Sequence, residues 1–336
     1  MGAIGNKGIV ACLYDRTARQ IDVIQPGATV YLKLGRAHRF YLSTEEPKLF
    51  GKDTENIQAT MKDAKWACIL NSLWEAAAES DKGTPYFGWV SHGSNEKQGL
   101  VDIAGIQTSY IKGPEIFLSP LDQDSYWLGF YYRMEVFNYL PGAGYYFNFM
   151  IVDQPKFRYA YFELQGAEPD SPSYFKDGYY NYGDFVTLFI ETHMLPMNEI
   201  IAGPNDIRHE LITHDLMLKV WLFDGEKDLL EEPIVNDKLK NFIKYITGSN
   251  VSLEVMFAID RKWKDVLHSK KDKFKWYSVR IEIVNNTMNR SYRYDELDST
   301  YYTFDLDTGK QIAHPVQRGF TVKYQSMDMI LKDFEQ

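Results

Sequence analysis

The chain has 336 residues, of which 45% are hydrophobic and 25% are charged, and this composition excludes an intrinsically disordered protein. Its formal net charge is −9, with 46 acidic against 37 basic side chains, which argues against nucleic-acid binding because that needs clustered lysine and arginine. A chain of this length predicts about two or three domains.

The cysteine content and the N-terminal region bear on the cell compartment. Cys12 and Cys68 form neither a disulfide framework nor a zinc motif. The apolar run 9–14 is too short for the core of a signal peptide, and charged residues follow it at once. No stretch approaches the apolar length of a membrane span. We therefore expect a cytoplasmic protein, or one exported without a cleaved signal peptide.

The first half of the chain predicts an aromatic-rich α+β domain over residues 1–165. Apolar residues at three- and four-residue steps predict one long helix over 53–80, with Cys68 on its apolar face. Aromatic and β-branched content predicts strands on both sides of this helix. These strands are expected at 9–14, 29–34, 86–90, 116–118, 127–137, 145–152 and 157–164.

Aromatic side chains gather between Tyr126 and Phe162, and this band is the candidate binding surface. Adjacent aromatic residues on a strand point to opposite faces, so one face can fill a core while the other meets a partner, a ligand or another domain. The alternative is a thick core with tyrosine hydroxyls at its edge. The predicted binding residues are Trp89, Trp127, Tyr131, Tyr132, Tyr145 and Tyr146.

The second half predicts an antiparallel β-sandwich. Residues 166–173 contain two prolines and small polar residues, which is typical of a linker. Four segments then alternate apolar and other residues with a period of two, at 186–191, 216–223, 251–260 and 277–283. This period predicts strands with one face on a core. We expect a sandwich over 174–290, a short helix over 237–246 and a C-terminal β extension over 291–336.

The segment 182–285 resembles a family of Ig-like β-sandwich modules in Bacteroidota proteins associated with type VI secretion and other contractile injection systems. The residues that carry the resemblance lie at 182–184, 186–195, 216–225, 251–260, 263–264 and 276–281. The insertion at 226–248 departs from a compact module of this kind. The resemblance implies an Ig-like fold and a structural or adaptor role, and it brings no active-site residue.

Two motifs are candidates for metal binding. His209 and His214 are five residues apart, whereas the histidines of a metalloprotease helix are four apart, so a polar loop explains them better than zinc. The segment from Asp305 to Gly309 resembles the start of a calcium-binding loop. The glutamate that would complete such a loop is missing, because Val316 occupies its position. A hairpin turn is the simpler interpretation.

A nucleophile set of Cys68, His92 and Asp102 is the remaining catalytic hypothesis. A reactive cysteine needs a nearby base and a positive environment, and Cys68 is expected among apolar neighbours instead. The sequence therefore predicts a mainly β, non-enzymatic protein that docks to protein partners through β surfaces and uses no cofactor or metal. The resemblance implies that it is a structural, adaptor or passenger protein of a contractile injection or secretion apparatus. The alternatives are a carbohydrate-binding sandwich protein and an effector hydrolase using Cys68 and His92.

Overall fold

The computed structural model describes most of the residues of the chain. They are 9–15, 20–44, 54–70, 90–91, 99–103, 106–120, 128–129, 131–139, 141, 145–163, 179–195, 197–203, 206–211, 215–247, 249–267, 273–287, 289–304 and 311–324. Over these residues the protein is mainly β, as expected, with several antiparallel sheets. None of its described helices has the length and apolar character needed to cross a membrane.

The N-terminal half contains two sheets that share one core. The six-stranded sheet has the order β3-β11-β10-β5-β8-β7, and the five-stranded sheet has the order β2-β1-β4-β9-β6. Phe40 and Phe147, one from each sheet, stack at 5.2 Å between ring centroids, so the two sheets pack face to face. The strands are β1 (Ile9–Asp15), β2 (Gln20–Ile24), β3 (Thr29–Lys33), β4 (His38–Thr44), β5 (Lys65–Leu70), β6 (Val90–Ser91), β7 (Gly99–Ile103), β8 (Ile106–Lys112), β9 (Glu115–Leu118), β10 (Tyr131–Phe137) and β11 (Tyr145–Val152).

The C-terminal half is the predicted sandwich. One sheet has the order β12-β13-β19-β18, and the facing sheet has the order β17-β16-β20-β21, with β24 also paired to β20. Its strands are β12 (Lys156–Phe162), β13 (Phe185–His193), β16 (Leu216–Phe223), β17 (Val235–Lys238), β18 (Ile243–Thr247), β19 (Asn250–Ala258), β20 (Phe274–Asn285), β21 (Arg290–Tyr294) and β24 (Phe320–Lys323). Two hairpins form separate two-stranded sheets. One consists of β14 (Met197–Gly203) and β15 (Asp206–Leu211), and the other of β22 (Thr300–Phe304) and β23 (Gln311–Pro315).

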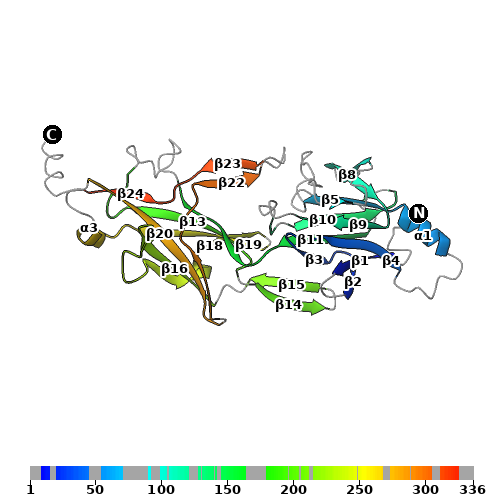
Figure 1. The fold of residues 1–336 in the computed structure, drawn as a ribbon, viewed down its shortest axis with the longest axis horizontal. Coiled ribbons are helices and arrows are strands. Elements are labelled where there is room, and N and C mark those ends of the chain that lie inside the picture. Colours follow the sequence, from blue (N-terminus) through cyan, green and yellow to red (C-terminus); the bar gives the residue numbers. More distant parts are fainter. Residues whose placement is uncertain are drawn as a thin grey trace.

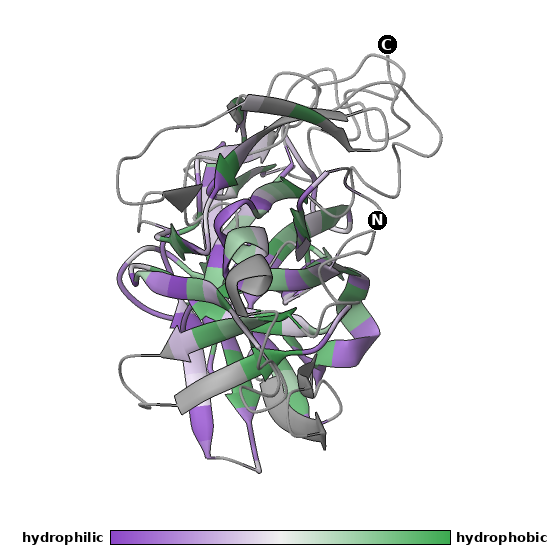
Figure 2. Ribbon diagram, turned by 90° about the vertical axis from the view of Figure 1, so that its right-hand side faces the viewer, coloured by the Kyte–Doolittle hydropathy of each residue, from purple (hydrophilic) through white to green (hydrophobic). Residues whose placement is uncertain are grey.

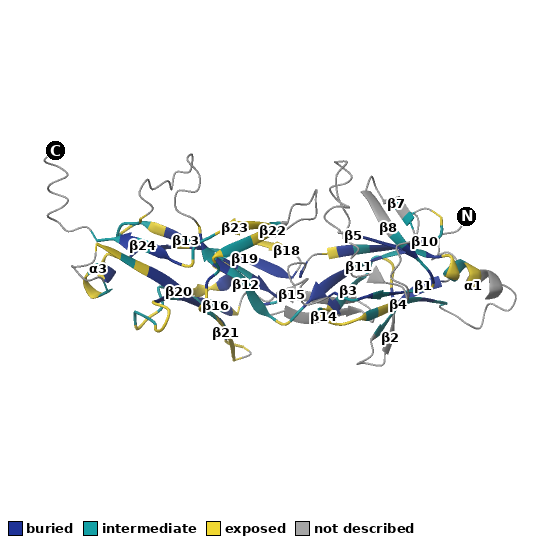
Figure 3. Ribbon diagram, turned by 45° about the horizontal axis from the view of Figure 1, so that its top comes forward, coloured by how far each residue is buried: buried dark blue, intermediate teal, exposed yellow. Residues whose placement is uncertain are grey.

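The four alternating segments form β13, β16, β19 and β20, which confirms the strand prediction. Their apolar sets point into a common buried cluster, because alternate side chains of a strand face opposite sides of its sheet. Hydrophobic and hydrophilic residues are interspersed over short stretches of the ribbon (Figure 2). Burial alternates between buried and intermediate residues along most of β13 and β16, whereas β20 has a continuous buried run over 277–281. Buried stretches of the sandwich strands are dark blue in Figure 3. The period of two therefore fixed which face of each strand is core.

The predicted long helix is wrong. Helix α1 covers Thr54–Lys62, and Lys65–Leu70 is strand β5, which pairs with β10 and β8 in the middle of its sheet. Residues 71–80 of the predicted helix lie outside the described residues. Trp66, Ala67, Cys68 and Ile69 are all buried, so the strand is covered on both faces. A strand buried on both faces is apolar at successive positions, and its period cannot be told from that of a buried helix.

The short helix expected over 237–246 is also wrong. That stretch contains the end of β17, a single 3₁₀ turn η3 (Leu239–Phe242) and most of β18. Its apolar residues are spaced as on a helix because the turn passes from one sheet of the sandwich to the other. One further helix, α3 (Lys262–Leu267), follows β19. The predicted linker 166–173 and strand residues 86–89 lie outside the described residues.

The two halves lie end to end along the long axis of the molecule (Figure 1). Buried polar side chains connect them. The Asn250 amide donates to the carbonyl oxygen of Leu128 at 2.6 Å, and its oxygen lies 2.8 Å from Nδ1 of His193. The backbone N–H of Asp153 donates to Nε2 of His193 at 3.0 Å. We call Leu128, Asp153, His193 and Asn250 the junction.

Candidate functional site

The structure separates the aromatic residues that the sequence proposed for binding. Tyr132 and Tyr145 are 0% and 3% exposed and belong to the N-terminal core, where Tyr132 stacks on Phe149 at 5.0 Å. The ring of Tyr146 lies 3.7 Å from the guanidinium of Arg133, which covers one of its faces. Tyr131 is exposed to 39%. On β10 and β11, the core interpretation of the aromatic band therefore accounts for most of its rings.

The two candidate tryptophans and most residues of the two metal motifs lie outside the described part of the chain. Trp89 and Trp127 lie outside the described residues, as do His214 and Asp305. His209 belongs to β15, in the β14–β15 hairpin. In the described part of the chain, no group of three histidine, cysteine or acidic side chains is placed to hold a metal ion. The strands β22 and β23 pair on either side of residues 305–310, as a hairpin requires.

Cys68 lies in a strand rather than in the predicted helix. Its side chain is 1% exposed, and burial raises the pKa of the thiol. A thiol with a raised pKa is a weak nucleophile, because the reactive species is the thiolate. His92 lies outside the described residues, and Asp102 is part of β7. The surroundings of Cys68 are therefore those of a core residue.

A surface that the sequence did not single out lies on the outer side of the β12-β13-β19-β18 sheet. We call it the aromatic face. The phase of the alternation places its residues opposite the core, since Val186, Leu188 and Ile190 point inward. Its members are Tyr159, Tyr161, Phe185, Thr187, Phe189, Glu191, Tyr245, Glu254, Met256 and Ala258. Three large apolar side chains on it are strongly exposed: Phe185 to 62%, Met256 to 59% and Tyr245 to 50%.

Stacked rings order one end of the aromatic face. Tyr161 stacks on Phe189 with centroids 5.6 Å apart, and both β12 tyrosines contact Tyr301 from the β22–β23 hairpin. The distances from Tyr301 are 5.2 Å to Tyr159 and 5.1 Å to Tyr161. This hairpin lies beside the sheet in Figure 1. The hairpin thus covers part of the face and leaves the β18–β19 side open.

Ion pairs frame the same face. Arg158 pairs with Glu191, and Lys244 pairs with Glu254 while its ammonium lies 5.3 Å from the centre of the Phe189 ring. Burial raises the pKa of Glu191, and the neighbouring Arg158 opposes that rise. Burial also raises the pKa of Tyr161 to about 12, so its hydroxyl stays protonated and can donate. The face therefore offers apolar rings, hydroxyl donors and paired charges, and this combination suits an interface.

One signal for this face was present in the sequence. Phe185 and Phe189 occupy the polar phase of an alternating strand, where a solvated sheet would carry Thr, Lys or Glu. Exposed aromatic residues in the outward phase are a better indication of binding than aromatic density, which mostly reports the core.

Comparisons with known proteins give weak structural likenesses. No protein-family model matches the sequence, and no curated protein does so either. A structure of Dpr2 Ig1-Ig2 in complex with DIP-Theta Ig1-Ig3 is 7% identical with a TM-score of 0.29, over 85% of this chain and 63% of that chain. Dimeric latent PorU from Porphyromonas gingivalis is 11% identical with a TM-score of 0.22, over 95% of this chain and 24% of that chain. Likenesses at these TM-scores do not bear on function.

Proposed function

We propose that this chain is a non-enzymatic protein-binding component that docks to a protein partner through the aromatic face. The observation that carries the proposal is the exposure of Phe185, Tyr245 and Met256 on one side of a single sheet. Isolated exposed apolar side chains are common, whereas several on one sheet face, next to hydroxyls and paired charges, are characteristic of interaction sites.

The resemblance of residues 182–285 suggests the setting of this binding. By that resemblance the chain acts as an adaptor, structural part or passenger of a contractile injection or secretion apparatus, in the cytoplasm or exported without a cleaved signal peptide. A protein of two β units joined by buried polar contacts is compatible with such a role. Support for the protein-binding proposal comes from the aromatic face, and support for the apparatus comes from the resemblance alone.

Capture from a native lysate with chemical cross-linking tests the proposal. The tagged chain should enrich a defined partner whose cross-links map to β13, β18 and β19. Tyr245→Glu should reduce the captured amount at least about tenfold, since aromatic anchors contribute most of the energy of interfaces. Val266→Glu is the matched control, because Val266 is 73% exposed on α3, away from the face. Equal capture by both variants, or no partner at all, would contradict the proposal.

Carbohydrate binding is the second candidate, because Tyr159, Tyr161 and Tyr245 give the outer side of the sheet three tyrosine rings. Sugar rings stack on open aromatic faces. Here Tyr161 already stacks on Phe189 and contacts Tyr301, so less of its ring is available. A glycan array separates the two candidates: a sugar ligand that is lost in Tyr161→Ala would favour carbohydrate, and an empty array would favour a protein partner.

A further inference from the structure

A pocket opens at one edge of the C-terminal sandwich, separate from the aromatic rings of β12. It has a volume of about 710 Å³. Its lining joins the loop 230–234, which follows β16, to the segment 257–261 at the end of β19. Phe257, Ile259 and Trp263 are nearly fully buried and form an apolar floor. The pocket thus lies between the edges of the two sheets.

The strand that borders this pocket has an open edge. Strand β19 pairs with β13 along its whole length, from Asn250 to Ala258. On its other side, β18 pairs with residues 250–253 only, and no other described strand pairs with residues 254–258. An unpaired strand edge is a template for an additional strand.

The direction of the backbone groups can be read from the neighbouring hydrogen bonds. The N–H and C=O of Ile259 bond to Asp184 and Gly183, on the β13 side. Because backbone groups alternate in direction along a strand, those of Met256 and Ala258 point to the opposite, open side. Each offers one donor and one acceptor to an incoming chain.

The charge around the pocket indicates what chemistry the incoming chain carries. The lining holds three carboxylates, Glu231, Glu232 and Asp260, against the single guanidinium of Arg261. Glu231 and Glu232 are exposed, and no ion pair joins either one to another described residue. Lysine and arginine side chains place their aliphatic stems on apolar surface and their charged heads at its rim. An apolar floor with an acidic rim fits such side chains.

From the open edge, the pocket and its charge, we infer that β19 accepts an extended, lysine- or arginine-rich segment of a partner protein as an added strand. The inference rests on the proposed function and specifies one contact of the partner. Main-chain hydrogen bonds to Met256 and Ala258 give affinity, and alternate basic side chains in the acidic pocket give specificity. A second copy of this chain is disfavoured as occupant, because its net charge of −9 repels an acidic rim.

The probe for the test is a fluorescent seven-residue peptide that alternates lysine and valine, with binding followed by anisotropy. The same peptide with glutamate in place of lysine should not bind. The double variant Glu231→Lys with Glu232→Lys should weaken binding of the lysine peptide at least about tenfold. The matched control, Glu163→Lys with Glu296→Lys, makes the same charge change at two exposed residues outside the pocket and should keep the affinity.

Two N-methylated peptides test strand addition separately from charge. Only alternate amides of an added strand face β19, so methylating one alternate set should abolish binding while methylating the other set should be tolerated. Equal effects of the two sets, or an affinity unaffected by the pocket variant, would overturn the inference and indicate electrostatic attraction only. If the chain dimerises without peptide and the pocket variant does not, the occupant of the β19 edge is a second copy of the chain. That result would also overturn the inference.

The two proposals fail in different ways. If the peptide does not bind but Tyr245-dependent capture of a partner remains, the strand-addition inference is wrong and the protein-binding function stands. If the peptide binds with the expected pattern while Tyr245→Glu captures as much partner as the control, the assignment of partner docking to the aromatic face is wrong. The edge of β19 is then the docking site.

Discussion

At the scale of single residues, the most informative side chain is His193, which is fully buried at the junction. Nε2 accepts from the backbone of Asp153, so the proton of the neutral ring resides on Nδ1, which faces the oxygen of Asn250. Burial is the main cause that lowers the pKa of His193, to about 4, with Arg158 and Lys156 lowering it further. Protonation would place a charge in the core and remove the acceptor that holds Asp153.

This geometry predicts an acid-sensitive stability. Because the pKa of His193 in the folded state, about 4, lies below the ordinary 6.5, the unfolded chain binds more protons in that window. The stabilisation is complete above pH 6.5 and is lost as the pH falls toward 4. The full loss is about 3 kcal/mol, from ~1.4 kcal/mol for each pKa unit. Urea unfolding at several pH values measures it.

His193→Gln should flatten this pH dependence while lowering the stability at neutral pH. His38→Gln, which removes a histidine from β4 outside the junction, is the control and should keep the wild-type dependence. The neighbouring Asp153 has a lowered pKa, owing to Lys156 and a backbone N–H, so its contribution is lost only below the histidine window. An unchanged slope in His193→Gln would show that another group titrates.

The two cysteines give a second test at this scale. Cys12 and Cys68 are each 1% exposed, and burial raises the pKa of both thiols. Neither should react with a thiol reagent in the folded protein within hours, and both should react at once in urea, because only the exposed thiolate is nucleophilic. Fast labelling of Cys68 in the native state would revive the hydrolase hypothesis.

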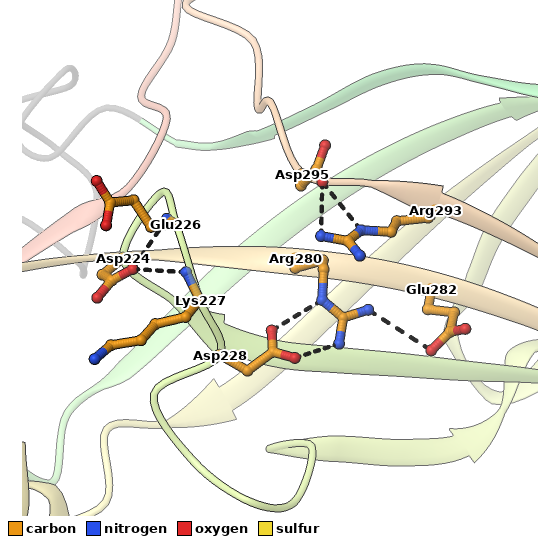
Figure 4. A network of polar contacts seen from close by, with 8 residues as sticks. All are labelled: Asp224, Glu226, Lys227, Asp228, Arg280, Glu282, Arg293 and Asp295. Carbon is orange, nitrogen blue, oxygen red and sulfur yellow. Dashed lines mark hydrogen bonds and ion pairs between the residues drawn. The ribbon is translucent and has the colours of Figure 1, made fainter.

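At the scale of elements, a polar network fixes the loop after β16 to β20 (Figure 4). Asp224 accepts from the backbone N–H groups of Glu226 and Lys227, and Gly225 has a φ of +99°, so the chain turns at this pair. The turn brings Asp228 onto Arg280, with two hydrogen bonds of 2.9 and 2.6 Å.

This network predicts unequal effects for two arginines. The Arg280 side chain is 9% exposed and also lies over Trp221, whereas the Arg293 side chain, paired with Asp295, is 57% exposed. Arg280→Ala should lower the free energy of unfolding by about 2 kcal/mol, because it leaves Asp228 without its charged partner. Arg293→Ala should change it by less than about 0.5 kcal/mol. Denaturant unfolding measures both, and similar losses would contradict the argument.

At the scale of the whole molecule, the junction makes one body of two β units with separate cores. Asn250 is the central contact, because its amide bonds to Leu128 in one unit and its oxygen meets His193 in the other. Gly129 is required beside it. Its φ is +81°, and a Cβ there would lie 2.6 Å from the Asn250 amide.

Asn250→Ala should loosen the two units. The change leaves the Leu128 carbonyl and the His193 ring without their partner, and we expect a loss of about 2 kcal/mol. It should also increase tryptic cleavage after Lys156, at the start of β12. Asn241→Ala, which removes an exposed amide of η3 that donates to Asp237, is the control. Equal cleavage in wild type and Asn250→Ala would show that other contacts hold the junction.

The sequence by itself determined the sandwich. Strands β13, β16, β19 and β20 each pack one face on the core. One-sided burial places apolar residues at every second position, and this alternation is visible within each segment of the sequence. It also determined the turn at Asp224-Gly225, because the φ of the glycine is a local requirement.

Only the tertiary structure decided the rest. Strand β5 pairs with strands that are distant in sequence and is buried on both faces. Its sequence therefore lacks the alternation of apolar and polar residues, and it was predicted as helix. Which tyrosines are buried, how His193 meets Asn250, and where β19 is left without a neighbour all depend on pairings between remote segments. Local periodicity reports which face of a strand is apolar, whereas the binding surfaces arise from what packs, or does not pack, against the other face and edge.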